Sequence, residues 1–253
     1  MIVFDRVSFS YGIHEVLKEV SFSIPFNEKV AILGGSGDGK TTLLKLILGL
    51  LRPDSGRIMI DGEDITAKEE DELREVRTKF SIVFQEGALF DSLNVKENVA
   101  FGLREYTKMT EEEIDRKVKE LLGKVGVEQA MELMPEELSG GMLRRVAIMR
   151  SLAAFEPKMF LYDEATTGLD PVNADIICRL ILDLTKGGKG FIIVTHKVFD
   201  ALRLADRFMF LKSGSILFDG NRNQLMQSSI QEIHVFLREL NLPLEASFGA
   251  GQG

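Results

Sequence analysis

The chain has 253 residues, a formal net charge of −8 and 45% hydrophobic residues. This length suffices for one large α/β domain, or a main domain with a small subdomain, built on a sizeable core. The acidic balance excludes a broad basic surface of the kind that holds nucleic acid, so we expect no nucleic-acid partner. The single cysteine, Cys178, lies in an apolar stretch, which indicates a buried reduced thiol and a reducing compartment.

No stretch of the sequence is long and apolar enough to cross a bilayer. The longest apolar stretch, residues 43–51, contains Lys45 and is far shorter than the roughly 20 residues that a spanning helix needs. The first ten residues carry charges where a signal peptide needs an apolar core. We therefore predict a soluble chain that reaches a membrane only through a partner.

Strand patterns recur along the chain and alternate with helical ones. Residues 1–9 and 16–24 alternate apolar and polar positions, which predicts half-buried antiparallel strands. Short continuous apolar runs predict strands buried on both faces of a parallel sheet, over residues 29–33, 80–84, 159–163 and 190–195. Because several of these runs lead into a helical stretch, we expect βαβ units and an α/β fold.

A helical stretch over about residues 90–155 interrupts these strands and predicts a helical insert in the sheet core. Within it, residues 110–126 have the pattern of an amphipathic helix. Thr110 can cap this helix, Glu113 completes a capping box, and Gly126 follows its end.

The pattern near the end of the chain predicts a hairpin around Ser213 and Gly214 and then an amphipathic helix over residues 229–240. Its apolar stripe consists of Ile233, Phe236, Leu237 and Leu240. We expect residues 241–253 to be a disordered tail. The charged run over residues 63–77 predicts a solvated helical face.

The sequence GGSGDGKT, residues 34–41, fits the phosphate-binding pattern G-x-x-x-x-G-K-[ST] between a predicted strand and a predicted helix. In such a loop the glycines let backbone N–H groups turn toward phosphates at the positive end of the helix. Lys40 would reach the β- and γ-phosphates, and Thr41 would give a hydroxyl to Mg²⁺. Asp38 is unexpected, because a carboxylate near phosphates is unfavourable unless it points to solvent. The predicted nucleotide-binding residues of this loop are Gly34, Gly35, Ser36, Gly37, Asp38, Gly39, Lys40, Thr41 and Thr42.

Two adjacent carboxylates, Asp163 and Glu164, end the predicted strand over residues 159–163. Neighbouring residues at a strand end point in different directions, so the two can divide the work. Asp163 can hold the Mg²⁺ shell while Glu164 polarises an attacking water. Together with a phosphate loop in the same βαβ core, the pair predicts nucleotide hydrolysis.

Three single residues and a second helix start add to this site. Gln85 could bind Mg²⁺ or water, His196 could contact the γ-phosphate, and Tyr11 could stack on adenine. Each has a plainer alternative, since a Gln or His at a strand end is usually structural and Tyr11 could be a partly exposed aromatic in a turn. Ser139, Gly140 and Gly141 begin a helix whose N-terminus favours an anion; the alternative is a tight turn with a cap.

In their order along nearly the whole chain, these residues resemble the nucleotide-binding subunit of an ABC transporter. The resemblance matches Tyr11 to the A-loop, Gln85 to the Q-loop, residues 139–141 to the signature, Asp170 to the D-loop and His196 to the switch histidine. It implies a P-loop NTPase of ABC type over residues 1–240: a mixed parallel-sheet core, an antiparallel β subdomain and a helical subdomain insert.

The resemblance also implies the chemistry. ATP and Mg²⁺ would be the ligands, with Thr41, Gln85 and Asp163 at the metal. Glu164 would be the general base and His196 the sensor of the γ-phosphate. In this family the signature of one subunit closes over the phosphate held by the P-loop of another, so a homodimer would form two composite ATP sites.

Finer details are similar to the Mla/Mkl branch of the family. Met142 stands where most transporters have glutamine, and the sequence around residues 134–145 is similar to that branch. This resemblance implies phospholipid transport that maintains membrane lipid asymmetry, with an integral-membrane permease and an MCE-domain lipid-binding protein as partners, at the cytoplasmic face of the cell membrane. The alternatives are a small polar solute importer and a non-transport ATPase of the iron–sulfur assembly type; a catalytically dead scaffold is disfavoured because every catalytic position is filled.

The sequence allows two interpretations for each of two regions. Ala88, Leu89 and Phe90 would lie near the groove that receives a permease coupling helix, or would simply pack between the core and the helical insert. The helix over residues 229–240 would pack on its own domain or support the neighbouring subunit.

The chain departs from the family pattern at three places. Ala165 replaces a proline after the carboxylate pair and would loosen a turn. Thr167 and Gly168 replace Ser-Ala before Leu169 and Asp170 and would alter the packing of the D-loop. Asp38 bears on ATP affinity, and none of these changes removes a catalytic group.

Overall fold

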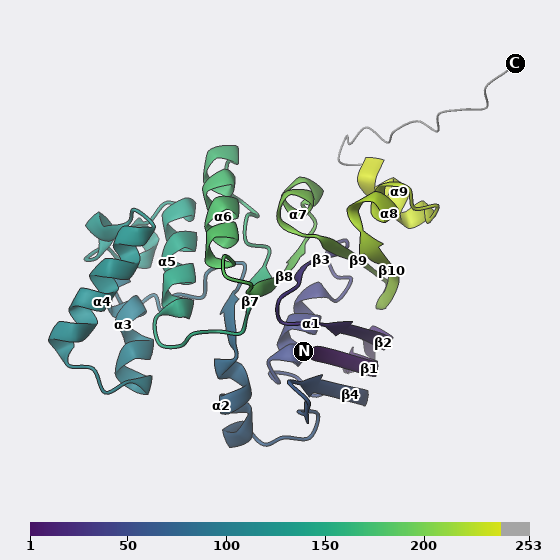
Figure 1. Ribbon diagram of the computed structural model, residues 1–253, viewed down its shortest axis with the longest axis horizontal. Helices are drawn as coiled ribbons and strands as arrows, with labels where there is room; N and C mark the ends of the chain where they lie inside the picture. Colours follow the sequence, from purple (N-terminus) through teal and green to yellow (C-terminus); the bar gives the residue numbers. More distant parts are fainter. Residues whose placement is uncertain (239–253) are drawn as a thin grey trace, which may run out of the picture.

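The computed structural model describes residues 1–238, in which helices surround two sheets (Figure 1). In this part of the chain the larger sheet has six strands in the order β10-β9-β3-β8-β7-β6. All neighbours pair in parallel except β10, which runs antiparallel to β9. The strands are β3 (Lys29–Leu33), β6 (Phe80–Val83), β7 (Met159–Asp163), β8 (Gly190–Thr195), β9 (Arg207–Lys212) and β10 (Ser215–Asn221).

The central strands are buried on both faces, as their apolar runs predict. In β3, Ala31 and Leu33 belong to one core cluster, whereas Val30 and Ile32 belong to a second one. Side chains alternate between the two faces of a strand, so an uninterrupted apolar run suits a strand that is covered on both sides. The carboxyl ends of these parallel strands meet at one edge of the sheet, which is where an open α/β fold binds its ligands.

The smaller sheet is antiparallel and, within the described residues, has the order β2-β1-β4-β5. Phe4 and Phe22 are opposite each other in the register, and their rings stack with centroids 4.5 Å apart. This pairing confirms the antiparallel strands predicted for residues 1–9 and 16–24. The strands are β1 (Ile2–Tyr11), β2 (His14–Ile24), β4 (Ser55–Ile60) and β5 (Glu63–Asp64).

Helices occupy the chain between β6 and β7, and Figure 1 shows them to one side of the sheets. They are α3 (Val95–Tyr106), α4 (Glu111–Lys124) and α5 (Gly140–Leu152), with short 3₁₀ turns at Glu128–Ala130 and Pro135–Glu137. The predicted start of α4 is confirmed: Thr110 Oγ1 accepts the N–H of Glu113, and the Glu113 carboxylate accepts the N–H of Thr110. The remaining helices are α1 (Lys40–Ile47), α2 (Glu70–Thr78), α6 (Pro171–Leu184), α7 (Val198–Leu204), α8 (Arg222–Met226) and α9 (Gln231–Arg238).

The hairpin predicted around Ser213 and Gly214 is confirmed as the turn between β9 and β10. The last described helix, α9, packs its apolar stripe on its own domain. Ile233 and Leu237 are buried, and the Phe236 ring lies 5.2 Å from the ring of Phe210 in β9. Leu240 and the tail predicted for residues 241–253 lie outside the described residues.

Two expectations from composition can be compared with the fold. Cys178 is fully buried in α6, and burial raises the pKa of its thiol to about 12, so it is a reduced core residue. Residues 1–238 contain no helix that is long and apolar enough to cross a membrane.

Candidate functional site

The phosphate loop, residues 34–39, connects the carboxyl end of β3 to α1. A Cβ on Gly34 would clash with the carbonyl oxygen of Leu211 in β9, so only glycine allows this close approach. Gly39 has a φ of 101° directly before α1, a conformation that L side chains rarely adopt. The chain thus turns abruptly onto the N-terminus of α1, where free N–H groups attract anions.

Lys40 lies inside this loop. Its Nζ donates to the carbonyl oxygens of Gly34 at 3.0 Å and Gly35 at 2.7 Å, and it lies 3.7 Å from Glu164 Oε1. The side chain is 7% exposed. The ammonium group is therefore held by the loop at the place where the phosphates of a nucleotide would arrive.

The side chain of Asp38 makes its contacts within the chain and does not line the cavity beside Lys40. Its carboxylate accepts the N–H of Gly35 at 2.7 Å and that of Ser213 at 3.2 Å, and it lies 3.5 Å from Lys212 Nζ. The side chain thus fastens the phosphate loop to the β9–β10 turn. The role of Asp38 in nucleotide binding stays a prediction.

Asp163 and Thr41 form the pair that could hold a metal ion. Thr41 Oγ1 donates to Asp163 Oδ1 at 3.0 Å. Burial raises the pKa of Asp163, although the Thr41 hydrogen bond opposes the shift. A hydroxyl and a carboxylate side by side at a phosphate loop suit Mg²⁺, which prefers oxygen ligands and takes the rest from phosphates and water.

Glu164 follows Asp163 in a strained backbone conformation, with a φ of 50°. Its Oε1 lies 3.0 Å from His196 Nδ1, and its Oε2 accepts hydrogen bonds from Thr167 at 2.8 Å and Thr195 at 3.0 Å. Burial acts to raise the pKa of Glu164, but the bonds from His196 and Thr167 outweigh it and lower the pKa. The carboxylate is therefore ionised at neutral pH and oriented by three neighbours, as a general base requires.

A cavity of about 380 Å³ opens onto these groups. Tyr11 is 46% exposed at its wall, and its ring meets Phe9 edge-on at 4.8 Å. Gln85 reaches the same cavity from the end of β6. The lining residues are Tyr11, Val16, Ser36, Gly37, Gly39, Lys40, Thr41, Thr42, Gln85, Glu164 and His196.

The structure thus brings together most of the predicted site, from five separate parts of the chain. Gly34 and Gly35 shape the loop and accept hydrogen bonds from Lys40 without lining this cavity. Asp163 does not line it either, but accepts a hydrogen bond from Thr41, which does. Thr195 was not among the residues predicted from the sequence, and Thr167 was noted there only as a departure from the family pattern. The available signal was a hydroxyl directly before His196 and another three residues after Glu164.

The signature residues lie elsewhere. Ser139 is exposed and caps α5 by accepting the N–H of Met142 at 3.3 Å. Ser139, Gly140 and Gly141 are absent from the lining of the nucleotide cavity among the residues that the structure describes. Within one copy of the chain, the helix start at Lys40 therefore opens onto this cavity, whereas the helix start at Ser139 does not.

Asp170 is also outside the cavity and caps α6. Its Oδ1 accepts the N–H groups of Val172 and Asn173 at 3.0 Å each, and its Oδ2 accepts the side-chain amide of Asn173 at 2.6 Å. The Asn173 bond is the main reason that the pKa of Asp170 is lowered. Because a Cβ on Gly141 would collide with the Asn173 amide, the starts of α5 and α6 touch at this point.

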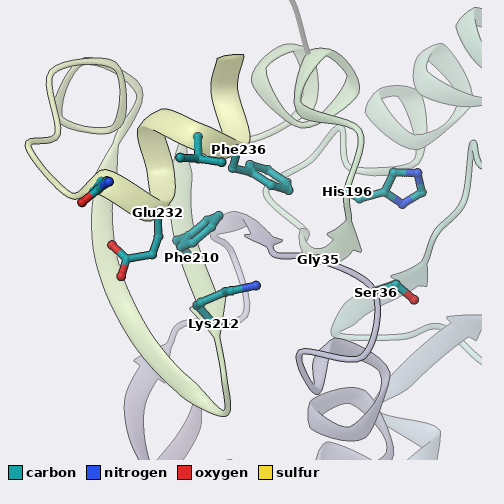
Figure 2. A pocket seen from close by; sticks show the side chains of 9 residues that line it. Gly35, Ser36, His196, Phe210, Lys212, Glu232 and Phe236 are labelled. Carbon is teal, nitrogen blue, oxygen red and sulfur yellow. The ribbon is translucent and has the colours of Figure 1, made fainter. Parts of the chain in front are cut away.

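A second cavity, of about 620 Å³, adjoins the phosphate loop, and no sequence pattern predicted it (Figure 2). Phe236 of α9 and Phe210 of β9 form its apolar wall, and Ser36 and His196 stand at its other side. The amphipathic pattern of residues 229–240 predicted the helix but not the gap beside it. The last described helix is thus a neighbour of the nucleotide site.

Comparison with known proteins agrees with this geometry. Residues 17–167 match the family model described as ABC transporter. The chain is 39% identical over 232 residues to MlaF, the intermembrane phospholipid transport system ATP-binding protein of Escherichia coli, across 91% of this chain and 86% of that protein. It is 39% identical over 229 residues to mkl, the probable ribonucleotide transport ATP-binding protein of Mycobacterium tuberculosis, across 90% of this chain and 64% of that protein.

A solved structure shows the same fold. It is the dimer of an ATP-binding cassette in a post-hydrolysis state, bound to ADP and Pi, with a TM-score of 0.81 and 32% identity over 87% of this chain and 98% of that one. Both the sequence matches and the fold therefore agree with a site in which the phosphate loop, Glu164 and His196 line one cavity. The chain belongs to the ABC transporter family and is one of its ATP-binding, ATP-hydrolysing subunits.

Proposed function

We propose that this chain binds Mg²⁺-ATP in the cavity of its phosphate loop and hydrolyses it as one half of a homodimer. The observation that carries this proposal is the separation of two half-sites: Lys40 and Glu164 line the cavity, whereas Ser139 is exposed outside it. The free helix start at Ser139 is then available to close over the γ-phosphate of a second copy. Two copies complete two sites in this arrangement.

The contacts and the family resemblance support a role for each residue of the site. Tyr11 stacks on the adenine, and the backbone of residues 34–42 with Lys40 surrounds the phosphates. Thr41, Asp163 and Gln85 would supply oxygen ligands to Mg²⁺, and the ion would neutralise phosphate charge when bound. Glu164 accepts a hydrogen bond from the attacking water, and His196 keeps that carboxylate in place while facing the γ-phosphate.

We further propose that the dimer drives a membrane permease whose cargo is phospholipid. The support is the role named for the Escherichia coli relative, together with the similarity of residues 134–145 to the Mla/Mkl branch. An MCE-domain protein would be the second partner, and the chain would work at the cytoplasmic face of the membrane. The mycobacterial relative is named as a ribonucleotide transport protein, so a ribonucleotide cargo is the alternative to be tested.

The Glu164→Gln substitution tests the proposal that Glu164 is the general base. The amide keeps the shape and the hydrogen bond from Thr195 but cannot act as a base, so ATP binding should persist while turnover falls by about 100-fold or more. We expect the variant to dimerise on addition of Mg²⁺-ATP and to remain a dimer. Phosphate release and light scattering measure the two effects.

Glu156→Gln is the matched control, because Glu156 is exposed and, within residues 1–238, pairs only with Lys189. It should hydrolyse ATP like the unmodified chain. If Glu164→Gln retained most of the turnover, Glu164 would not be the base. If Glu164→Gln bound ATP but remained monomeric at saturating ATP, the proposed composite site would be wrong, whereas the proposed ATP binding would be retained.

The trapped Glu164→Gln dimer also tests the cargo. It would be extracted from membranes in mild detergent with Mg²⁺-ATP, and bound chains and lipids would be identified by mass spectrometry. A permease with specifically enriched phospholipid is the expected result. A permease with bound nucleotide cargo or no lipid would overturn the lipid proposal, and soluble partners alone would overturn transport.

A further inference from the structure

The segment from residue 84 to residue 93, here named the Gln85 loop, leaves the end of β6 and carries Gln85 to the nucleotide cavity. Its turn is tight: the N–H of Gly87 donates to the carbonyl of Phe84 at 2.8 Å, and φ is 76° at Gly87 and 50° at Ala88. A positive φ is strained for a residue with a Cβ. Contacts from elsewhere in the chain must therefore hold this turn.

Arg144 of α5 holds the start of the turn. Its side chain is 4% exposed, and its Nη1 donates to the carbonyl oxygen of Phe84 at 2.7 Å. Within the described residues its Nε has no partner. Burying a guanidinium with an unsatisfied N–H is costly, so packing alone favours an apolar side chain at this position. What arginine adds is the bond to the loop carbonyl and a positive charge that interacts with Asp163.

Arg150, further along the same helix, holds the other end of the turn. Its Nη1 donates to the carbonyl oxygen of Ala88 at 2.6 Å, and its guanidinium carbon lies 5.1 Å from the centre of the Phe90 ring. The Phe90 ring is also 4.8 Å from the ring of Phe101 in α3. A charged donor on a carbonyl and a cation over an aromatic face both stabilise this arrangement.

Asn98 of α3 fixes the end of the loop. It is fully buried; its Oδ1 accepts the N–H of Phe90 at 2.8 Å, and its Nδ2 donates to the carbonyls of Phe90 at 3.1 Å and Leu93 at 2.8 Å. The side chains that hydrogen-bond to this loop therefore come from α3 and α5. The loop is fastened to the helix that begins at Ser139.

We propose that Arg144 and Arg150 are positioning residues that fasten the Gln85 loop to α5, so that Gln85 and Ser139 move as parts of one body. Gln85 then enters the nucleotide cavity at a place set by the helix and not by its own backbone. A force on residues 88–90 from a partner reaches Ser139 through the same two arginines. The inference rests on the proposed role of Gln85 in hydrolysis.

A double-substitution cycle tests this proposal on the purified full chain. Single-turnover hydrolysis of Mg²⁺-ATP would be measured for Gln85→Ala, Arg144→Met and the two combined, with ATP affinity measured separately. We expect Arg144→Met to slow hydrolysis by about tenfold or more with ATP affinity nearly unchanged, since small misplacements of this kind have such effects. In the Gln85→Ala background it should slow hydrolysis little further. Arg144→Lys, which keeps a donor, should recover part of the rate.

Arg145→Met is the matched control, because Arg145 is on the same helix but donates to the carbonyls of Gly141 and Val125. Its effect on the rate should add to that of Gln85→Ala. Additive effects for Arg144→Met as well would overturn the positioning role. If Gln85→Ala alone changed nothing, the proposed role of Gln85 would fail instead.

Hydrogen exchange at the amide of Gly87 gives a second measurement that needs no activity. The Gly87 N–H closes the turn onto the same Phe84 carbonyl that Arg144 contacts. Both Arg144→Met and Arg150→Met should speed exchange there by about tenfold, whereas Arg145→Met should not. Arg150 is partly exposed, so its substitution should fold even if Arg144→Met does not. Unchanged exchange in Arg150→Met would contradict the proposal.

Discussion

Two adjacent carboxylates of this protein have opposite electrostatic environments. Hydrogen bonds from His196 and Thr167 outweigh burial and lower the pKa of Glu164, whereas burial raises the pKa of Asp163. Glu164 is therefore ionised at neutral pH, while Asp163 carries a charge that the folded chain does not fully compensate. A cation at Thr41 and Asp163 would supply that compensation.

This difference predicts that Asp163→Asn stabilises the metal-free chain while abolishing hydrolysis. At neutral pH the ionised Asp163 costs the fold free energy, and the amide removes this cost while keeping an oxygen for Thr41. We expect the melting temperature at pH 7 to rise by a few degrees, since about 1 kcal/mol corresponds to about 2–4 °C in a chain of this size. Calorimetry without nucleotide or Mg²⁺ measures the change.

The pH dependence supplies the control for that prediction. Because the folded pKa of Asp163 lies above its ordinary value, the unmodified chain relieves the cost itself by protonation as the pH falls through the folded pKa. The stability difference between the two proteins should therefore shrink at acidic pH. A difference that grew on acidification, or a less stable Asp163→Asn at pH 7, would show that the pKa is lowered instead.

At the scale of elements, the contact between the starts of α5 and α6 joins the signature to Asp170. Gly141→Ala should separate the two helices, because the new methyl group would collide with the Asn173 amide. We expect a loss of about 1–3 kcal/mol in the free energy of unfolding, as for other overpacked sites. Asn173→Ala should restore part of it in the double variant, measured by denaturant titration.

Gly123→Ala is the control for that element. Gly123 lies inside α4, where an added Cβ would lie 3.4 Å from the Glu128 carboxylate, in ordinary contact. Alanine there should be neutral or stabilising by up to about 1 kcal/mol. Equal losses for the two glycines would mean that the α5–α6 contact has no special role.

The elements differ in how far the sequence could predict them. The phosphate loop, the β7 carboxylates and the capping box of α4 depend on neighbours a few residues apart, so local patterns predicted them correctly. The direction of Asp38 depends on Ser213, and the hold on the Gln85 loop depends on Arg144, sixty positions from Phe84. No periodicity in the sequence records such pairings. For the same reason the cavity beside Phe236 was missed although its helix was predicted.

At the scale of the whole molecule, the separation of Lys40 from Ser139 predicts that two inactive variants can complement each other. Lys40→Ala removes the phosphate contact, and Ser139→Arg blocks the helix start. A mixed dimer contains one site in which both halves are intact. Equal mixtures should recover about a quarter of the sites of the unmodified protein, because half of the dimers are mixed and each has one working site.

Phosphate release from the mixture, compared with each variant alone, measures this recovery. Mixing Lys40→Ala with Glu164→Gln is the control, since both changes affect the same half-site and no intact site can form. Activity in the control, or none in the Lys40→Ala and Ser139→Arg mixture, would contradict a shared site.

The place of Tyr11 has a practical consequence for spectroscopy. The sequence contains no tryptophan and three tyrosines, of which Tyr162 is fully buried, whereas Tyr11 stands at the wall of the nucleotide cavity. A Tyr11→Trp protein would carry a single indole, placed where an adenine ring would stack on it. Its emission would report nucleotide arrival and departure in the isolated chain without any attached dye.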